Sequence, residues 1–281
     1  MANAVDRFAS IAAAYDAARP HPPAALADVL RQWSGAGAPD VVDVGAGTGL
    51  STILWAGRAA TVTAVEPGDD MRAIAARRVG LAAGSPAGPA GQDAGQGAGT
   101  TTFAVIAGSA ETTGLPDNCA DIVTASQAMH WFDADRALPE IVRILRPGGV
   151  FAAYDCDWPP CIDWEIDVAY AEFTRRMTVL EVARGLRPPH AGKRHLETIR
   201  ASGLFRHATE IALHSREEGD AQRLIDIAMS QGGAAALAEA GVPEEEFGLA
   251  NLREVAARRL PAARPWYWTY WVRMGVTGPA A

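Results

Sequence analysis

The residues with the clearest chemical meaning form a glycine-rich run, Asp43-Val44-Gly45-Ala46-Gly47-Thr48-Gly49. An apolar stretch at 40–44 leads into this run and predicts a buried strand, and residues 50–58 after it predict a helix. Glycine lacks a Cβ, so its backbone can turn sharply and approach a ligand closely. Because ligands of open α/β sheets bind beyond the carboxyl ends of the strands, we expect a ligand-binding turn here.

The spacing within the run narrows the choice of ligand. Aligned with the dinucleotide fingerprint G-x-G-x-x-G, the run puts Leu50 at the third glycine position, which disfavours an NAD-dependent oxidoreductase. The run also lacks the G-K-[ST] of a phosphate loop. Its D-x-G-x-G-x-G spacing, with Asp43 two residues before Gly45, matches instead the loop that binds S-adenosylmethionine.

Small or polar residues also follow the next three predicted strands. Glu66 stands just past the strand at 61–65, where a carboxylate can accept hydrogen bonds from both hydroxyls of a ribose; the alternative is a solvated loop residue. Ser109-Ala110-Glu111 follow the third strand, and Gln127-Ala128-Met129-His130-Trp131-Phe132-Asp133 follow the fourth. Four consecutive strand ends are therefore suited to a nucleoside.

A regular alternation of strands and helices up to residue 156 must position these segments, and it predicts βαβ units with a parallel sheet. The further elements that we expect are strands at 61–65, 101–108, 150–156, 208–215 and 266–274, and a turn followed by a strand within 117–125. We expect helices at 71–79, 163–183, 193–203, 219–230 and 244–259, and one that starts at 133 and ends at the Pro-Gly-Gly break of 147–149. We divide the chain into an N-terminal helical segment closing the site (1–35), an S-adenosylmethionine-binding α/β core (36–156), a cap insertion (157–192) and the remainder of the core, with further helices and the final strand (193–281). The Gly/Ala-rich residues 82–100 predict a flexible surface loop, with a mobile lid as the alternative.

Several motifs between residues 15 and 155 resemble the class I S-adenosylmethionine-dependent methyltransferases. The small-molecule branch that includes trans-aconitate methyltransferase has an SAE…LP…D motif before a Q-x-x-HWFD motif, and an opening Y-x-x-x-RP. The corresponding residues here are Ser109-Ala110-Glu111, Leu115-Pro116-Asp117, Gln127 to Asp133, and Tyr15 to Pro20. The resemblance implies an α/β fold, a doubly wound Rossmann-like seven-stranded sheet whose last strand is antiparallel, with an inserted helical cap.

The resemblance also implies roles for single residues, with S-adenosyl-L-methionine as the cofactor. The glycine-rich run, including Asp43, Gly45, Ala46, Gly47 and Gly49, would hold the methionine part, and Glu66 the ribose. Pro67 and Met71 would flank the adenine, Ala110 and Glu111 would lie near its amino edge, and Ser109 stands where many relatives have aspartate. Gln127, Tyr15 and Arg19 complete the predicted cofactor set, although Arg19 is equally consistent with a surface arginine.

Methyl transfer from a sulfonium needs chiefly a nucleophile held about 3 Å from the methyl carbon. A base is needed only if the acceptor must lose a proton. His130 is the first candidate base and Asp155 the second; His130 packed beside Trp131 is the alternative. The predicted substrate-binding residues are Trp131, Tyr154, Trp158 and His190. His195 belongs to a basic cluster with His190 that suits a polar substrate or a solvated face.

Composition excludes some functions and limits others. With 33 acidic and 25 basic residues the net charge is −8, which disfavours a nonspecific nucleic-acid partner. The sequence shows no membrane segment or signal peptide, and the three cysteines predict reduced thiols in the cytoplasm. Cys156 and Cys161 are too few for zinc, so we predict no metal. We expect methylation of an O or N atom of a small, secondary metabolite; a C-methyltransferase and a nonmethylating S-adenosylmethionine-binding protein are the alternatives.

Overall fold

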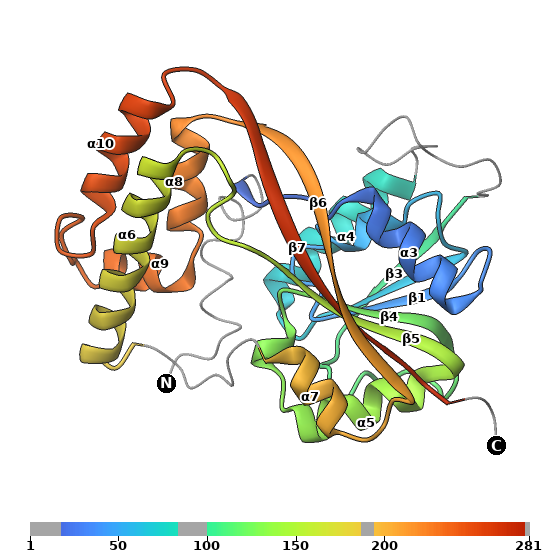
Figure 1. Ribbon diagram of the computed structural model, residues 1–281. Helices are drawn as coiled ribbons and strands as arrows, with labels where there is room; N and C mark the ends of the chain where they lie inside the picture. The colour runs from blue at the N-terminus through green and yellow to red at the C-terminus, as the bar shows by residue number, and fades with distance from the viewer. Residues whose placement is uncertain (1–17, 84–99, 187–193, 279–281) are drawn as a thin grey trace. The chain divides into compact units, whose positions relative to one another are not determined.

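The computed structural model describes residues 18–83, 100–186 and 194–278 (Figure 1). The predictions for Tyr15 and His190, and those for loop residues 84–99, lie outside the described residues. The other predicted elements and site residues can be followed in the structure.

A seven-stranded sheet forms the centre of the fold, in the order β3-β2-β1-β4-β5-β7-β6. The strands are β1 (Asp40–Val44), β2 (Thr61–Val65), β3 (Thr102–Ile106), β4 (Ala120–Ser126), β5 (Leu145–Cys156), β6 (His207–Gly219) and β7 (Arg264–Val276). The first five pair in parallel, and β7 pairs antiparallel with β5. This confirms the predicted Rossmann-like sheet with an antiparallel last strand.

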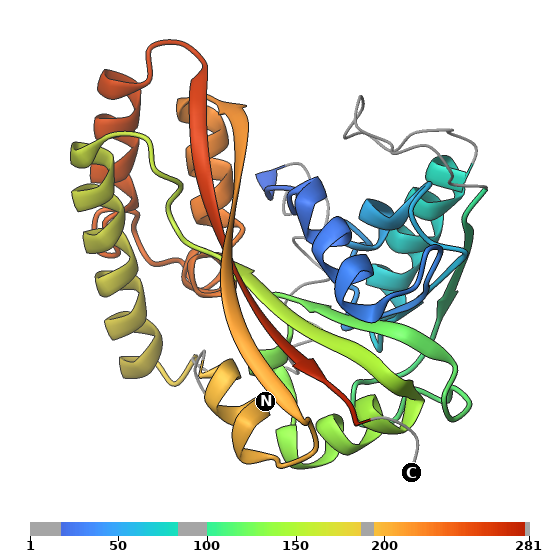
Figure 2. The same cartoon turned by 45° about the vertical axis from the view of Figure 1, so that its right-hand side comes forward.

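Helices cover both faces of this sheet. They are α3 (Ala24–Ser34), α4 (Asp69–Ala83), α5 (Ala134–Ile144) and α7 (His195–Ala201), with two short 3-10 helices, η1 (Thr52–Trp55) and η2 (Met129–Trp131). In both views α3 and α4 lie on one face of the sheet, and α5 and α7 lie on the other (Figures 1 and 2). The sheet is therefore doubly wound, as predicted.

The amphipathic pattern of α5 explains why it packs where it does. Its buried residues, Ala137, Leu138, Ile141 and Ile144, fall at helical spacing and join one apolar cluster with Val123 and Phe151 of the sheet. A Leu or Ile side chain buried in this way contributes about 1.5–3 kcal/mol. The strands that α5 covers, β4 and β5, are the two that end in the candidate catalytic segments.

Two predicted helices differ from the structure. Residues 50–58 form a turn and then the 3-10 helix η1, because the glycine-rich loop continues through Gly49. The helix predicted to run from 133 to the Pro147-Gly148-Gly149 break ends earlier, at Ile144, and residues 145–149 already belong to β5. Gly148 has φ +79°, and a Cβ on Gly149 would lie 2.8 Å from the Arg146 carbonyl oxygen, so glycines shape the strand entry here.

The chain divides into two compact units. One contains residues 21–156, 190–213 and 270–281, and the other contains residues 1–20, 157–189 and 214–269. This division differs from the predicted boundaries of the N-terminal segment, the cap and the remainder, which stay predictions. Helix α3 belongs to the sheet unit, and residues 214–269, which we assigned to the core, belong with 157–189. The helical pattern of 219–259 shows that helices form but not which unit they join.

Among its described residues, the second unit contains four helices: α6 (Trp164–Ala183), α8 (Ala221–Met229), α9 (Gly232–Glu239) and α10 (Leu249–Arg259). In Figure 2, α6 (yellow) and α10 (red) run side by side, and the two helices contact each other. Phe173 of α6 packs on Phe247 just before α10, with ring centroids 6.3 Å apart. Helix α9 was not predicted, because its Gly/Ala-rich sequence carries no amphipathic pattern.

Candidate active site

The glycine-rich loop follows β1, and its backbone adopts conformations that favour glycine. Gly45, Gly47 and Gly49 have φ values of +66°, +56° and +76°. A Cβ on Gly45 would lie 2.8 Å from the Ala128 Cβ, whereas a Cβ on Gly47 would meet nothing within 4 Å. The loop is therefore packed against the end of β4 at Gly45 and open at Gly47, so that a ligand could approach the backbone there.

Glu66 joins the end of β2 to this loop. Its Oε2 accepts a hydrogen bond from the Gly47 N–H at 2.9 Å, and its Oε1 accepts one from the Gly68 N–H at 2.9 Å. The side chain is 8% exposed. Each carboxylate oxygen has a second lone pair, so Glu66 can still accept hydrogen bonds from a ribose. The open backbone at Gly47 and the acid beside it fit an adenosyl cofactor.

Asp43 supports the loop from inside the sheet. It is fully buried, and its two carboxylate oxygens accept hydrogen bonds from the hydroxyls of Thr52 and Thr124, at 2.7 and 2.8 Å. Burial raises the pKa of this carboxyl to about 6. In this structure Asp43 supports the loop from within the sheet, and its predicted contact with the cofactor stays a prediction.

Five further predicted cofactor residues lie in the same unit as the loop: Pro67, Met71, Ser109, Ala110 and Glu111. Met71 and Ala110 are buried, and Pro67 is exposed. Ser109 forms a short bridge with Thr112, and the Glu111 carboxylate accepts a hydrogen bond from the Asp133 N–H at 3.0 Å. Glu111 thus connects the loop after β3 to the start of α5.

Gln127 and Tyr154 lie where β4 and β5 end. Gln127 has φ +49°, and its backbone N–H donates to the Tyr154 carbonyl oxygen at 2.8 Å. Its side-chain amide lies 3.3 Å from the Cys156 Sγ. Tyr154 is 1% exposed, and its hydroxyl shares a short hydrogen bond with Ser51. Burial raises the pKa of that hydroxyl. Tyr154 therefore stabilises the loop through Ser51, and substrate binding by Tyr154 stays a prediction.

His130 and Asp155, the two candidate bases, are brought together with a third residue, His195 of α7. His130 Nδ1 lies 3.9 Å from Asp155 Oδ1, and His195 Nε2 lies 3.1 Å from Asp155 Oδ2. The two imidazole rings have centroids 6.2 Å apart. Asp155 and His195 are almost completely buried, and 14% of the His130 side chain is exposed. The grouping of these three residues was not predicted, because His195 comes 40 residues after Asp155 in the numbering.

Arg273 of β7 holds the Asp155 carboxylate. Its NH1 donates to Asp155 Oδ2 at 3.2 Å, and its Nε donates to Glu210 Oε2 at 2.6 Å. β7 pairs with β5, with Arg273 opposite Ala153, so the antiparallel strand delivers this side chain. Arg273 had no motif around it, and only the pairing of the strands identifies it as part of the site.

Trp131, Arg19 and Trp158 complete the predicted site residues. Trp131 is 37% exposed, and its ring centroid lies 4.9 Å from that of His130. Arg19 and Trp158 belong to the second unit, where the Arg19 guanidinium lies 4.5 Å from the Trp158 ring centroid. Arg19 also donates to the Ser230 hydroxyl and carbonyl oxygens at 3.1 and 3.2 Å. These contacts hold Arg19 within its own unit, and its predicted role at the cofactor stays a prediction.

The sheet order, the glycine-rich loop after β1 and the acid after β2 are the features of class I methyltransferases. Comparison with known proteins agrees: residues 42–153 match the family model described as a methyltransferase domain. Uncharacterized methyltransferases of Mycobacterium bovis and Mycobacterium tuberculosis are 38% identical over 143 residues. The malonyl-[acyl-carrier protein] O-methyltransferase of Pectobacterium atrosepticum is 33% identical over 113 residues, which are 40% of this chain and 36% of that protein.

A solved structure from Anaeromyxobacter dehalogenans, assigned as a type II methyltransferase, is similar over most of the chain. It has a TM-score of 0.65 and 26% identity, with 93% of this chain and 99% of that chain covered. The mycobacterial match covers 50% of this chain and 49% of its relatives, so it spans about half the length of the curated proteins. Residues 42–153 thus match a methyltransferase domain, and the comparisons support a class I S-adenosylmethionine-dependent methyltransferase with S-adenosylmethionine as the cofactor. Among the helices of the described residues, none has the length and apolar character needed to cross a membrane.

Proposed function

We propose that this protein transfers a methyl group from S-adenosylmethionine to an oxygen or nitrogen atom of a small metabolite. The observation that carries the proposal is the group of polar side chains at the end of β5. Asp155 lies at the same edge of the parallel sheet as Gly45, because β1, β4 and β5 pair in register. The cofactor loop and a polar acceptor site would then share one edge.

The chain's own part in the reaction is to bind and orient. Bound S-adenosylmethionine supplies an electrophilic methyl carbon on a sulfonium. Glu66 would accept hydrogen bonds from the ribose hydroxyls, and the backbone at Gly47 would lie along the cofactor. Gln127, which follows β4, and Met71, near the start of α4, complete the pocket in this proposal. Such positioning contributes several kcal/mol to the rate, because the acceptor needs no further ordering.

His130 and Asp155 keep the acceptor-side roles predicted for them. A buried polar cluster suits an acceptor with an O–H or N–H group, because its hydrogen bonds replace those that the acceptor makes in water. The O-methyltransferase from Pectobacterium atrosepticum is a relative with an oxygen acceptor in its name, which agrees with this choice. The alternatives are a C-methyltransferase on the same scaffold and a protein that binds the cofactor without methylating.

Calorimetry with S-adenosylhomocysteine tests the cofactor site. We expect a micromolar Kd, about −8 kcal/mol, and at least tenfold weaker binding by Glu66→Ala, which loses both ribose hydrogen bonds. Asp70→Ala, on the exposed first turn of α4, is the control and should bind like the wild type. If wild-type protein bound no S-adenosylhomocysteine, the proposed function would be wrong.

A methyl donor labelled at the methyl group, incubated with a panel of hydroxy acids, phenols, amines and carbon nucleophiles, tests the acceptor. We expect label on oxygen or nitrogen compounds, and a turnover at least tenfold lower for His130→Ala with cofactor affinity unchanged. Label on carbon would favour the C-methyltransferase. No transfer to any compound, despite tight cofactor binding, would favour the nonmethylating alternative.

A further inference from the structure

The cluster of His130, Asp155 and His195 has the composition and spacing of a metal site. Two imidazoles and one carboxylate each offer one ligand atom, and these three atoms lie within 4.8 Å of one another. We propose that His130 Nδ1, Asp155 Oδ1 and His195 Nε2 bind a divalent transition-metal ion. The proposal that an ion binds here does not depend on the proposed methyl transfer. Its proposed use, holding the acceptor, rests on the function proposed above.

The distances suit an ion with only small adjustments. Zinc binds imidazole nitrogen and carboxylate oxygen at about 2.0–2.2 Å, so two ligand atoms of a tetrahedral zinc ion lie about 3.4 Å apart. His130 Nδ1 and Asp155 Oδ1 are 3.9 Å apart, which is too long for a hydrogen bond between them. A shift of about 0.5 Å would bring these two atoms to the separation of two ligands on one ion. This ligand set is also one that iron and other first-row metals accept.

His195 provides an independent observation. The residue is 3% exposed, and its Nε2 forms no hydrogen bond among the described residues, although Asp155 Oδ2 is 3.1 Å away. The ring nitrogen is therefore close to the carboxylate but not aimed at it in hydrogen-bonding geometry. A buried polar atom without a hydrogen bond costs about 1–3 kcal/mol. A metal ion beside Nε2 would satisfy this atom.

The surrounding charges favour a cation. Arg273 occupies Asp155 Oδ2 at 3.2 Å and is itself bonded to Glu210, so Asp155 Oδ1 remains on the side that faces His130. A hydrogen-bonded carboxylate of this kind is oriented for its metal, as in known metal sites. With neutral imidazoles, the two carboxylates and the guanidinium leave a net charge of −1. An added divalent cation is therefore attracted.

Three protein ligands would leave coordination positions for a substrate. Zinc sites with three protein ligands and an open fourth position are catalytic rather than structural. An acceptor carrying a hydroxyl or carboxylate oxygen would take that position, and an O–H bound there would release its proton to water more easily. The proposal therefore specifies the acceptor class as an oxygen compound able to bind a metal.

The test is metal binding by the intact protein after treatment with a chelator. Calorimetry with Zn²⁺, and visible absorption with Co²⁺, should show one ion per chain at micromolar Kd or tighter. His195→Ala should weaken binding by about 100-fold or more, because removing even an outer partner of a metal ligand costs 10- to 100-fold. His207→Ala, an exposed histidine of β6, is the control and should bind like the wild type.

Two further measurements separate the possible outcomes. His195→Gln is a second variant in case His195→Ala unfolds, and circular dichroism checks the fold of both. S-adenosylhomocysteine affinity is measured on the same samples and should be unchanged. No stoichiometric ion in the wild type, or equal affinity in the folded His195 variants, overturns the metal site even when the cofactor still binds. Loss of cofactor binding in the wild type instead overturns the proposed function.

Discussion

At the scale of single residues, burial decides what each polar group can do. Glu66 is 8% exposed and can still accept hydrogen bonds from a ligand. Asp43, two residues before the first loop glycine, is completely buried in the sheet. The hydroxyls of Thr52 and Thr124 satisfy Asp43 but do not cancel the cost of burying its charge. Asp43 therefore stabilises the loop geometry at some cost in free energy.

This cost makes the protein's stability depend on pH. The pKa of Asp43 is about 6 in the folded protein, against about 3.9 unfolded, so the folded state binds more protons between pH 4 and pH 6. Asp43 should therefore lower the free energy of unfolding by up to about 3 kcal/mol as the pH rises through this range. Urea unfolding of wild type and Asp43→Asn at pH 4, 5, 6 and 7 measures the difference, and parallel pH curves would contradict the prediction.

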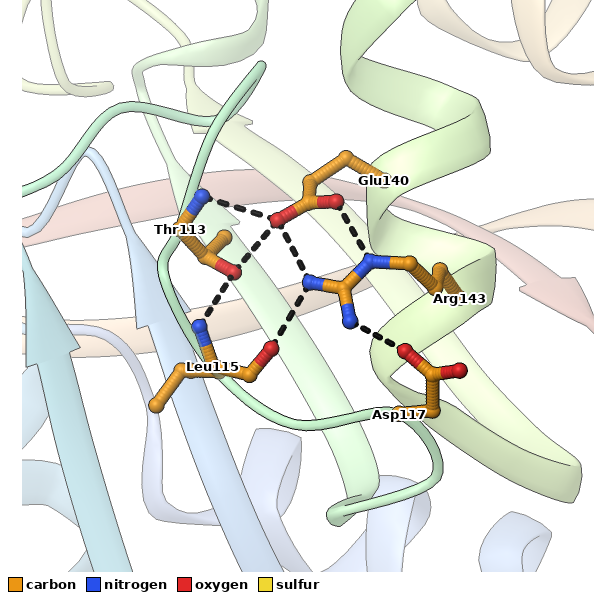
Figure 3. Close-up of polar contacts among 5 residues, drawn as sticks. All are labelled: Thr113, Leu115, Asp117, Glu140 and Arg143. Atoms are coloured by element: carbon orange, nitrogen blue, oxygen red, sulfur yellow. Dashed lines mark hydrogen bonds and ion pairs between the residues drawn. The ribbon is translucent and has the colours of Figure 1, made fainter.

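At the scale of elements, the LP…D motif has a structural explanation. The loop at 113–117 is held to α5 by Glu140 and Arg143 (Figure 3). Glu140 Oε1 accepts hydrogen bonds from the Thr113 N–H and hydroxyl, and Arg143 donates to Glu140, to the Leu115 carbonyl oxygen and to Asp117. This network fixes the loop that leads from the third strand end into β4.

Removing Arg143 should loosen that loop. The Arg143 guanidinium holds the pKa of Glu140 at about 2, so the interaction stabilises the fold above pH 4.5 and is lost as the pH falls toward 2. Because Arg143 is about one third exposed, we expect Arg143→Ala to cost only about 1 kcal/mol at pH 7. Arg136→Ala, exposed on the same helix, is the control. Equal unfolding free energies of both variants, by urea titration, would show that the network contributes nothing.

At the scale of the whole molecule, each unit has its own anchoring contacts. In the second unit Arg19 is 9% exposed, donates twice to Ser230 and lies over the Trp158 ring. These contacts connect three segments that are far apart in the sequence. Arg19, which the sequence motif assigns to the cofactor, therefore also has contacts that would explain it as a stabilising residue.

Arg19→Ala distinguishes the two roles. Loss of two hydrogen bonds and a cation–π contact should lower the free energy of unfolding by about 1–3 kcal/mol, with S-adenosylhomocysteine affinity within twofold of wild type. Urea unfolding and calorimetry on the same preparation provide both values. Arg216→Ala, whose side chain is exposed, is the control. A large loss of affinity at unchanged stability would instead return Arg19 to the cofactor site.

Local sequence determined the parts of this protein that depend on short-range chemistry. Apolar runs predicted the strands of the parallel sheet. The glycine-rich run and Glu66 predicted a cofactor loop, because a turn and the acid that follows the next strand can both be read from residues close in sequence. The sequence analysis misplaced two helix ends: the start of a helix directly after the glycine-rich loop, and the last residue of α5. At both places glycines shape the backbone, and periodicity alone does not show how.

Only the tertiary structure decided how distant segments meet. It placed His195 and Arg273 against Asp155, buried Asp43 and Tyr154, and assigned residues 214–269 to the second unit. No local pattern encodes these outcomes, because strand pairing and helix packing bring together side chains that are distant in the chain. The sequence alone thus predicted the cofactor, whereas the fold decided which side chains lie beside Asp155.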